Sequence, residues 1–251
     1  MKIKKILVSQ PKPASEKSPY YDIAEKYGVE IVFRPMIKVE GLSPKEFRQS
    51  KINLPDYSAV IFTARTAVDH FFRLCEENRY QVPDTMRYFC TSEQIALYLQ
   101  KYIVYRKRKI SFGLTGRLDD EQFLAAVHKN SKEKFLMPVS DTLPERMEAL
   151  RDMKIDLTPA MMYRTVSNDF RPDEPFDYDM LIFFSPAGIE SLKKNFPDFV
   201  SEGNQKAIIG ALGAPTAKAV RDAGLELSIE APTPENPSMT SALDSFLAAQ
   251  Q

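Results

Sequence analysis

An internal repeat constrains the fold of this chain more than any other feature of its sequence. Residues 57–68 (Tyr-Ser-Ala-Val-Ile-Phe-Thr-Ala-Arg-Thr-Ala-Val) match residues 178–189 (Tyr-Asp-Met-Leu-Ile-Phe-Phe-Ser-Pro-Ala-Gly-Ile). The pattern of each copy predicts a buried strand followed by a helix, and a second strand and helix follow near residues 88–100 and 207–223. Two copies of one such unit predict two similar α/β domains with a cleft between them.

The N-terminal segment adds a further strand, helix and strand before the first copy of the repeat. Residues 3–8 and 29–33 are short apolar runs, and between them residues 20–27 have helical spacing that ends at Gly28. Short links between such elements predict a right-handed crossover in a parallel sheet. The C-terminal copy has no such pair of strands directly before it, so we expect it to use the N-terminal pair.

This arrangement predicts a discontinuous domain of residues 1–38 plus 166–251 and an inserted domain of residues 39–165. The two connecting segments, residues 35–39 and 160–165, are expected to run side by side as a hinge. The predicted fold class is therefore α/β, with two similar parallel-sheet domains joined by a two-stranded hinge and the active site in the interdomain cleft.

The composition excludes several classes of protein. The 251 residues hold 34 Lys plus Arg and 34 Asp plus Glu, so the excess of positive charge that a general nucleic-acid binder needs is missing. With two Cys and two His, a disulfide scaffold is excluded and no metal site is expected. The sequence shows no apolar run of the ~20 residues that span a bilayer and no secretory signal, so we predict a cytoplasmic protein without a membrane partner.

Motifs for covalent or nucleotide chemistry are missing from the sequence. It has no Gly-x-Ser-x-Gly turn, no Gly-x-Gly-x-x-Gly spacing and no phosphate loop. His70 and His128 lie in helical stretches without evident carboxylate partners, and we expect both on the surface. Cys75 and Cys90 are expected to be buried thiols. An enzyme with this sequence would work without a metal, a cofactor or a covalent nucleophile.

Several turns from a predicted strand to a predicted helix carry residues that could bind a ligand. The carboxyl ends of parallel strands share one edge of a sheet, and the free amides of a helix start attract anions. Ordinary helix capping is the alternative explanation for the hydroxyl groups at these turns. The candidate substrate-binding residues are Thr63, Arg65, Ser92, Ser140, Ser185, Ala187, Gly188, Gly213 and Thr216.

In their order and spacing, several of these segments resemble the uroporphyrinogen-III synthase family over essentially the whole chain. The matching segments are residues 61–68, 161–165, 182–189, 213–217 and 231–234. The resemblance implies two α/β domains on a two-stranded hinge with the active site in the cleft. It also implies a cofactor-independent carbon–oxygen lyase, which closes hydroxymethylbilane to uroporphyrinogen III with loss of water and inversion of the last pyrrole ring.

The resemblance also assigns roles to single residues. Tyr163 matches a tyrosine that is expected to assist departure of the substrate hydroxyl, and a phenol with a pKa near ~10 remains a proton donor at neutral pH. Packing between the domains is the alternative role for Tyr163. In the first copy of the repeat, the glycine and threonine that match Gly213 and Thr216 are lost, which leaves Thr91 or Ser92 as substitutes.

The expected partner is the small-molecule tetrapyrrole substrate, with a possible transient transfer from hydroxymethylbilane synthase to a monomeric enzyme. Two other functions are compatible with the sequence. One is a non-catalytic two-domain protein that binds a polycarboxylate ligand in its cleft. The other is a regulatory protein built on a degenerate synthase domain.

Overall fold

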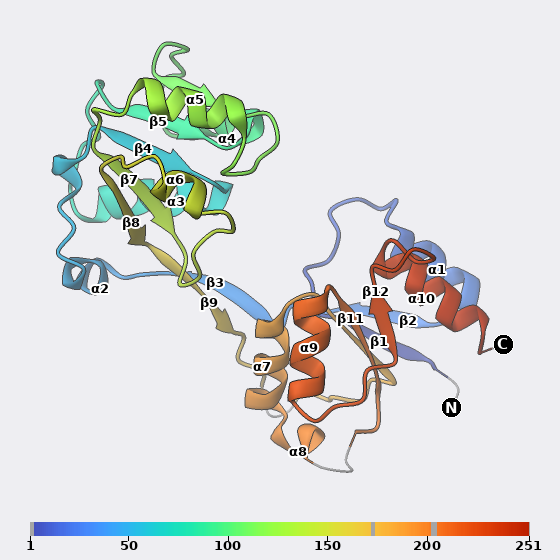
Figure 1. The fold of residues 1–251 in the computed structure, drawn as a ribbon. Coiled ribbons are helices and arrows are strands. Elements are labelled where there is room, and N and C mark those ends of the chain that lie inside the picture. Colours follow the sequence, from blue (N-terminus) through green and yellow to red (C-terminus); the bar gives the residue numbers. More distant parts are fainter. Residues whose placement is uncertain (1–2, 172–173, 202–204, 251) are drawn as a thin grey trace. The chain divides into compact units, whose positions relative to one another are not determined.

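The computed structural model describes residues 3–171, 174–201 and 205–250, which form two compact units (Figure 1). Unit 1 comprises residues 1–38 and 166–251, and unit 2 comprises residues 39–165. Each unit contains its own five-stranded parallel sheet with helices on its faces, so the predicted α/β class with two parallel sheets is confirmed. Within the described ranges, no helix is both long enough and apolar enough to cross a membrane.

The sheet of unit 1 combines strands from both ends of the chain. Its order is β12-β11-β10-β1-β2, and all neighbours are parallel. The strands are β1 (Lys5–Val8), β2 (Glu30–Phe33), β10 (Met180–Phe183), β11 (Ile208–Leu212) and β12 (Ile229–Ala231). Ile6 lies opposite Met180, so the N-terminal strands do pair with the C-terminal copy of the repeat, as the sequence predicted.

Alternation along the strands of unit 1 produces two core layers. Ile6 packs in the layer with α1 (Pro19–Tyr27) and α10 (Met239–Ala248), whereas Leu7 packs in the layer with α7 (Pro186–Asn195) and α9 (Ala214–Asp222). Figure 1 shows α7 and α9 side by side, with the short helix α8 (Pro197–Val200) beyond them. Apolar residues on both faces explain why β1 and β10 are nearly continuous apolar runs.

Unit 2 has the same strand pattern, with the first copy of the repeat at its centre. Its order is β6-β5-β4-β7-β8, again parallel throughout. The strands are β4 (Ala59–Phe62), β5 (Arg87–Cys90), β6 (Ile110–Phe112), β7 (Phe135–Val139) and β8 (Leu157–Met161). The helices are α2 (Pro44–Gln49), α3 (Arg65–Glu77), α4 (Glu93–Tyr98), α5 (Glu121–Lys129) and α6 (Glu148–Arg151), with 3₁₀ turns at Leu54–Asp56 and Leu99–Lys101.

The chain passes between the units along β3 (Ile37–Gly41) and β9 (Tyr163–Ser167), which form a two-stranded sheet. The strand expected over residues 160–165 is in fact interrupted at Met162, and its first two residues belong to β8. Met162 is fully buried; its N–H donates to the carbonyl of Val139, while its own carbonyl accepts from the N–H of Leu42. The backbone therefore changes from one sheet to the other at this residue.

Candidate functional site

The candidate residues of unit 2 lie where its central strands end. Thr63 follows β4, Ser92 follows β5 and Ser140 follows β7. These strands are parallel neighbours, so their carboxyl ends lie at one edge of the sheet, as expected. Arg65 is the exposed first residue of α3, and its guanidinium carbon lies 5.4 Å from the centre of the Tyr98 ring.

Two of these hydroxyl groups are engaged in local turns. Ser92 caps α4, since its side chain accepts a hydrogen bond of 3.4 Å from the N–H of Ile95. Ser140 Oγ donates to the carbonyl of Thr142 at 2.8 Å and accepts from its N–H at 3.2 Å. Thr91, the other substitute in this copy, is fully buried. Helix capping therefore accounts for the local contacts of Ser92, and a turn with Thr142 accounts for those of Ser140.

Thr63 borders a cavity of about 280 Å³ that no sequence motif indicates. Two arginines in the loops after β6 and β7, Arg117 and Arg146, also line this cavity, and both donate hydrogen bonds to Asp119. Arg117, followed by Arg146, holds the pKa of the Asp119 carboxyl well below its usual range. Sequence periodicity gave no signal for these loop residues, because their pairing depends on two loops that meet only in the fold.

In unit 1 the candidate residues lie at the turns after β10 and β11, which are also parallel neighbours. Ser185 precedes α7, and its side chain makes no capping hydrogen bond. Gly213 precedes α9 with φ of 86°, a backbone conformation that favours glycine. Thr216 is only 2 % exposed, so its side chain lies within the protein rather than on the surface of the turn.

The turn after β10 is also tightly packed. Ala187 is partly exposed in the first turn of α7, whereas Gly188 is buried. A Cβ atom on Gly188 would lie 3.1 Å from the Cδ1 atom of Phe183, so glycine allows the helix to approach the strand closely.

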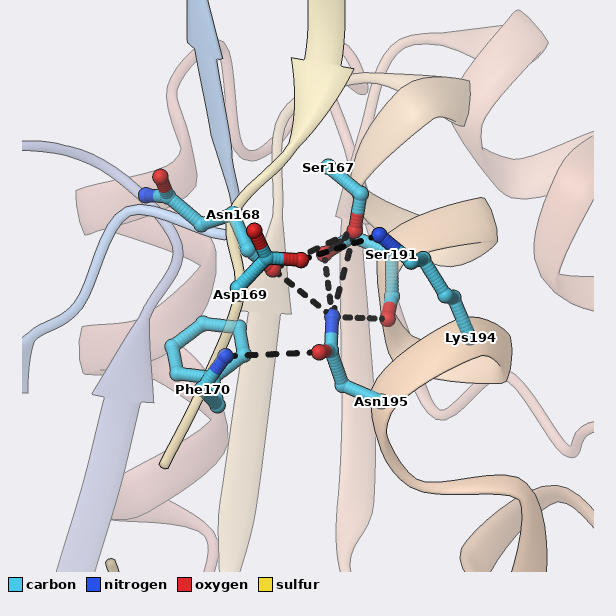
Figure 2. Close-up of polar contacts among 7 residues, drawn as sticks. All are labelled: Ser167, Asn168, Asp169, Phe170, Ser191, Lys194 and Asn195. Carbon is cyan, nitrogen blue, oxygen red and sulfur yellow. Dashed lines mark hydrogen bonds and ion pairs between the residues drawn. The ribbon is translucent and has the colours of Figure 1, made fainter. Parts of the chain in front are cut away.

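Polar contacts hold α7 against the segment that follows β9 (Figure 2). Ser167 Oγ donates to Ser191 Oγ at 2.8 Å, and the side-chain nitrogen of Asn195 donates to the carbonyl of Asn168 at 2.8 Å. Ser191 is fully buried, whereas Ser167 and Asn195 are half-buried, so these bonds lie at the edge of the core. They fix the position of the helix whose first turn carries Ala187 and Gly188.

Tyr163, the candidate catalytic residue, begins β9 and is half-buried at the margin of the unit 2 core. Burial, followed by the nearby charge of Asp141, raises its pKa, so the phenol keeps its proton at neutral pH. Over the three described stretches of the chain, its hydroxyl makes no hydrogen bond with another residue. The ring of His70 stacks on it, with centroids 5.1 Å apart and an interplanar angle of 18°.

His70 is half-buried under the Tyr163 ring, so the surface position expected for it holds only in part, whereas His128 is exposed as expected. His70 lacks a carboxylate partner on its own helix, but the residue that covers it comes from β9, far along the chain. One local feature of the sequence could have indicated a contact for His70: Arg73 lies three residues later on the same helix face, and it donates a hydrogen bond to His70.

The two cysteines are buried, as predicted, and burial raises the pKa of each thiol to about 12. Neither thiol is therefore ionised at neutral pH. In the part of the chain that the structure describes, no group of three or more His, Cys, Asp or Glu side chains is arranged to hold a metal ion.

A family model and several solved structures match this chain. A family model described as uroporphyrinogen-III synthase HemD matches residues 18–241. Uroporphyrinogen-III synthetase from Helicobacter pylori 26695 is similar in structure, with a TM-score of 0.57, 14% identity, and coverage of 98% of this chain and 100% of that chain. This likeness shows a common fold. No curated protein sequence matches the chain.

Two structures of uroporphyrinogen III synthase from the extremely thermophilic bacterium Thermus thermophilus also match. A mutant form has a TM-score of 0.49 and 16% identity, and covers 99% of this chain and 100% of that chain. The wild-type form has a TM-score of 0.43 and 17% identity, and the match covers 99% of this chain and 98% of the wild-type chain.

Proposed function

The chain belongs to the uroporphyrinogen-III synthase family, and we propose that it closes hydroxymethylbilane to uroporphyrinogen III as a cofactor-independent carbon–oxygen lyase. The family match over residues 18–241 carries this proposal. In the proposed reaction, the substrate loses its hydroxyl as water to leave an azafulvene. The substituted carbon of the last pyrrole ring attacks this electrophile, and the spiro intermediate then fragments and recloses with that ring inverted.

We assign the proton donor for water loss to Tyr163. Its phenol keeps its proton at neutral pH, and its hydroxyl makes no hydrogen bond with a described residue, so the O–H group is available to a substrate. The proton passes from the phenol oxygen to the departing hydroxyl. Because the linear substrate also closes unaided to the symmetric isomer I, the enzyme acts chiefly by holding the reacting carbons in the geometry that leads to isomer III.

We further propose that helix N-termini bind the acetate and propionate groups of the substrate. The helices α3, α7 and α9 begin at the candidate turns, and none has an acidic residue in its first turn. Their unpaired amides and partial positive charge favour a carboxylate at these positions. Because Thr216 is buried, the turn after β11 would contribute backbone amides rather than the threonine hydroxyl.

The test is the ratio of isomers I and III formed when the protein is added to porphobilinogen and hydroxymethylbilane synthase. Tyr163→Phe keeps the ring and removes only the hydroxyl, so we expect isomer III formation to fall by about 100-fold, the lower end of general acid assistance. The matched control is Tyr105→Phe, at another partly buried ring of the same core cluster, which should retain the parent rate.

More isomer I, rather than unreacted substrate, should accompany the loss of activity. If Tyr163→Phe forms isomer III at the parent rate, Tyr163 is a packing residue. The donor would then be sought among Thr63, Ser185 and bound water, because the Thr216 side chain is buried.

Other aspects of the function stay predictions from the sequence. These are an active site between the two units, a monomeric state, a cytoplasmic location and a transient transfer of substrate from hydroxymethylbilane synthase. The rival function, a non-catalytic polycarboxylate-binding protein, is not favoured by the family match.

A further inference from the structure

His70 and Tyr163 form a stacked pair that joins α3 to β9. Their ring centroids are 5.1 Å apart and the rings are 18° from parallel. Each side chain is half-buried, so water reaches only part of each ring. An aromatic neighbour at this distance restricts the rotation of the phenol about its side-chain bonds.

Arg73 fixes the orientation and the protonation form of the imidazole. Its Nε donates to His70 Nδ1 at 3.2 Å, its Nη2 donates to the carbonyl of Leu42 at 2.8 Å, and its Nη1 lies 2.7 Å from Glu77. A guanidinium can only donate hydrogen bonds, so Nδ1 of His70 must offer its lone pair. The imidazole in this arrangement is therefore neutral, with its proton on Nε2.

The backbone of β3 closes one side of this arrangement at Gly41. A Cβ atom on Gly41 would lie 2.5 Å from Nη2 of Arg73 and 2.7 Å from Nδ1 of His70, closer than real Cβ contacts. Any other residue at this position would displace Arg73 and His70 from the positions that they occupy here. His70 is thus confined by β3, by Arg73 and by the ring that it covers.

We propose that His70 is a positioning residue: its neutral imidazole, held by Arg73, keeps the ring of Tyr163 in the orientation that the reaction uses. The inference rests on the proposed role of Tyr163 for its effect on activity, whereas its structural part is independent of that role. Protonation of His70 replaces the lone pair on Nδ1 with an N–H that faces the Nε–H of Arg73. The hydrogen bond is then lost, and the phenol loses the support of a fixed neighbour.

The burial of His70 and the charges around it set the pH at which it gains a proton, and this pH lies on the acid side of neutrality. Burial and then Arg73 lower its pKa below the ordinary value of 6.5, while Asp69 and Glu77 on the same helix raise it by smaller amounts. From β9 the facing group is the uncharged phenol of Tyr163, and Gly41 of β3 has no charge. The stacked arrangement is fully stable above pH 6.5 and weakens as the pH falls through the lowered pKa.

The structural part can be tested by NMR without any activity measurement. In protein labelled with ¹³C in its tyrosine rings, the signal that disappears in Tyr163→Phe belongs to Tyr163. We expect this signal to shift on acidification with a midpoint below pH 6.5, and the shift to be absent in His70→Phe. A Tyr163 signal that does not move, or that moves equally in His70→Phe, would overturn the inference.

Two substitutions distinguish the contribution of the His70 ring, which stacks on Tyr163, from that of its Nδ1 atom, which accepts a hydrogen bond from Arg73. His70→Asn retains an acceptor for Arg73 but removes the stacked ring, so we expect about a 10-fold lower rate of isomer III formation, within the cost of a misplaced group. His70→Phe retains a ring and removes the titration, so it should lose about 3-fold and show no decline in rate as the pH falls below about 6.5. Equal losses in both variants, with unchanged pH profiles, would contradict a positioning role.

A double variant distinguishes this inference from the proposed function. If His70 acts through the hydroxyl of Tyr163, adding His70→Asn to Tyr163→Phe should cause little further loss. Parent activity in Tyr163→Phe alone would refute the donor role, and the NMR result would still decide whether His70 positions the ring. Thermal melting of each variant establishes that it is folded.

Discussion

The side-chain nitrogen of Asn195 donates a hydrogen bond of 2.8 Å to the backbone carbonyl of Asn168, joining the end of α7 to the segment after β9 (Figure 2). The same nitrogen lies 2.9 Å from the carbonyl of Ser191 and 3.1 Å from Ser167 Oγ. On the opposite side of the amide, its oxygen accepts from the N–H of Phe170 at 3.4 Å. The site therefore requires a donor toward the carbonyls and an acceptor toward the amide, which asparagine supplies together.

This geometry predicts that Asn195→Asp destabilises the protein more than Asn195→Ala. Alanine removes the hydrogen bonds, for an expected loss of about 1–3 kcal/mol in the free energy of unfolding. Aspartate has the same shape but would place a negative charge against two carbonyl oxygens. Urea unfolding measures both, with Lys194→Ala as an exposed control that should change stability by less than about 0.5 kcal/mol. An aspartate variant as stable as the alanine variant would contradict this account.

At Thr91 we predict a substitution that stabilises the protein, in contrast to those at Asn195. Its Oγ1 is buried and has no hydrogen-bond partner among the residues that the structure describes. Thr91→Val removes this hydroxyl and keeps the side-chain shape, so we expect the free energy of unfolding to rise by about 1 kcal/mol. Thr91→Ser, which keeps the hydroxyl and removes the methyl group, should lower it. If the valine variant is the less stable one, the hydroxyl has a partner such as a buried water.

The turn before α9 offers a direct test of carboxylate binding. Pro215 is exposed in the first turn of this helix, so Pro215→Glu would bring a competing negative charge to its amides. We expect affinity for uroporphyrinogen III to fall roughly 2- to 5-fold relative to Pro215→Gln, from the strength of charge interactions at helix ends. Calorimetry under anaerobic conditions measures this affinity. Equal affinities of the two variants would make the turn a structural cap, and a low-salt measurement should enlarge a true difference.

We also predict that unit 2 folds as an independent domain. The strands of its sheet pair only with one another, so a fragment of residues 39–165 contains the whole sheet and both of its core layers. This fragment should unfold in a single cooperative transition, whereas residues 1–160 should not form one compact unit, because β1 would lack β10. Circular dichroism during thermal melting tests both fragments. A compact 1–160 fragment beside an unfolded 39–165 fragment would refute the prediction.

The sequence predicts the sheets well because their signals are local. Buried parallel strands are short apolar runs, and the repeat marks the central strand of each sheet before any packing is considered. The interruption at Met162 could not be predicted, since it depends on hydrogen bonds to Val139 and Leu42 from two different segments of the chain. No local pattern distinguishes a strand that continues from one that changes its partner.

In the candidate site, too, the local features could be predicted from the sequence, whereas those that depend on distant segments could not. The turns after β4, β5, β10 and β11 follow from the rule for parallel sheets, and the structure places them at the expected edges. The burial of Thr216 and the stacking of His70 on Tyr163 depend on packing between distant segments. A histidine without a nearby carboxylate looks exposed in the sequence, although an aromatic ring can cover it in the fold.

The pairing of Ile6 with Met180 sets an order of events during synthesis. A ribosome adds about 5–20 residues per second, so β1 waits roughly 9–35 s for β10, the strand that pairs with its second edge. Meanwhile the strands of unit 2 can all emerge and pair. A nascent chain at this stage carries one finished sheet and, ahead of it, a strand with an open edge that could pair with another chain. Pauses in translation between residues 39 and 180 would prolong that exposure and with it the risk of pairing with another chain.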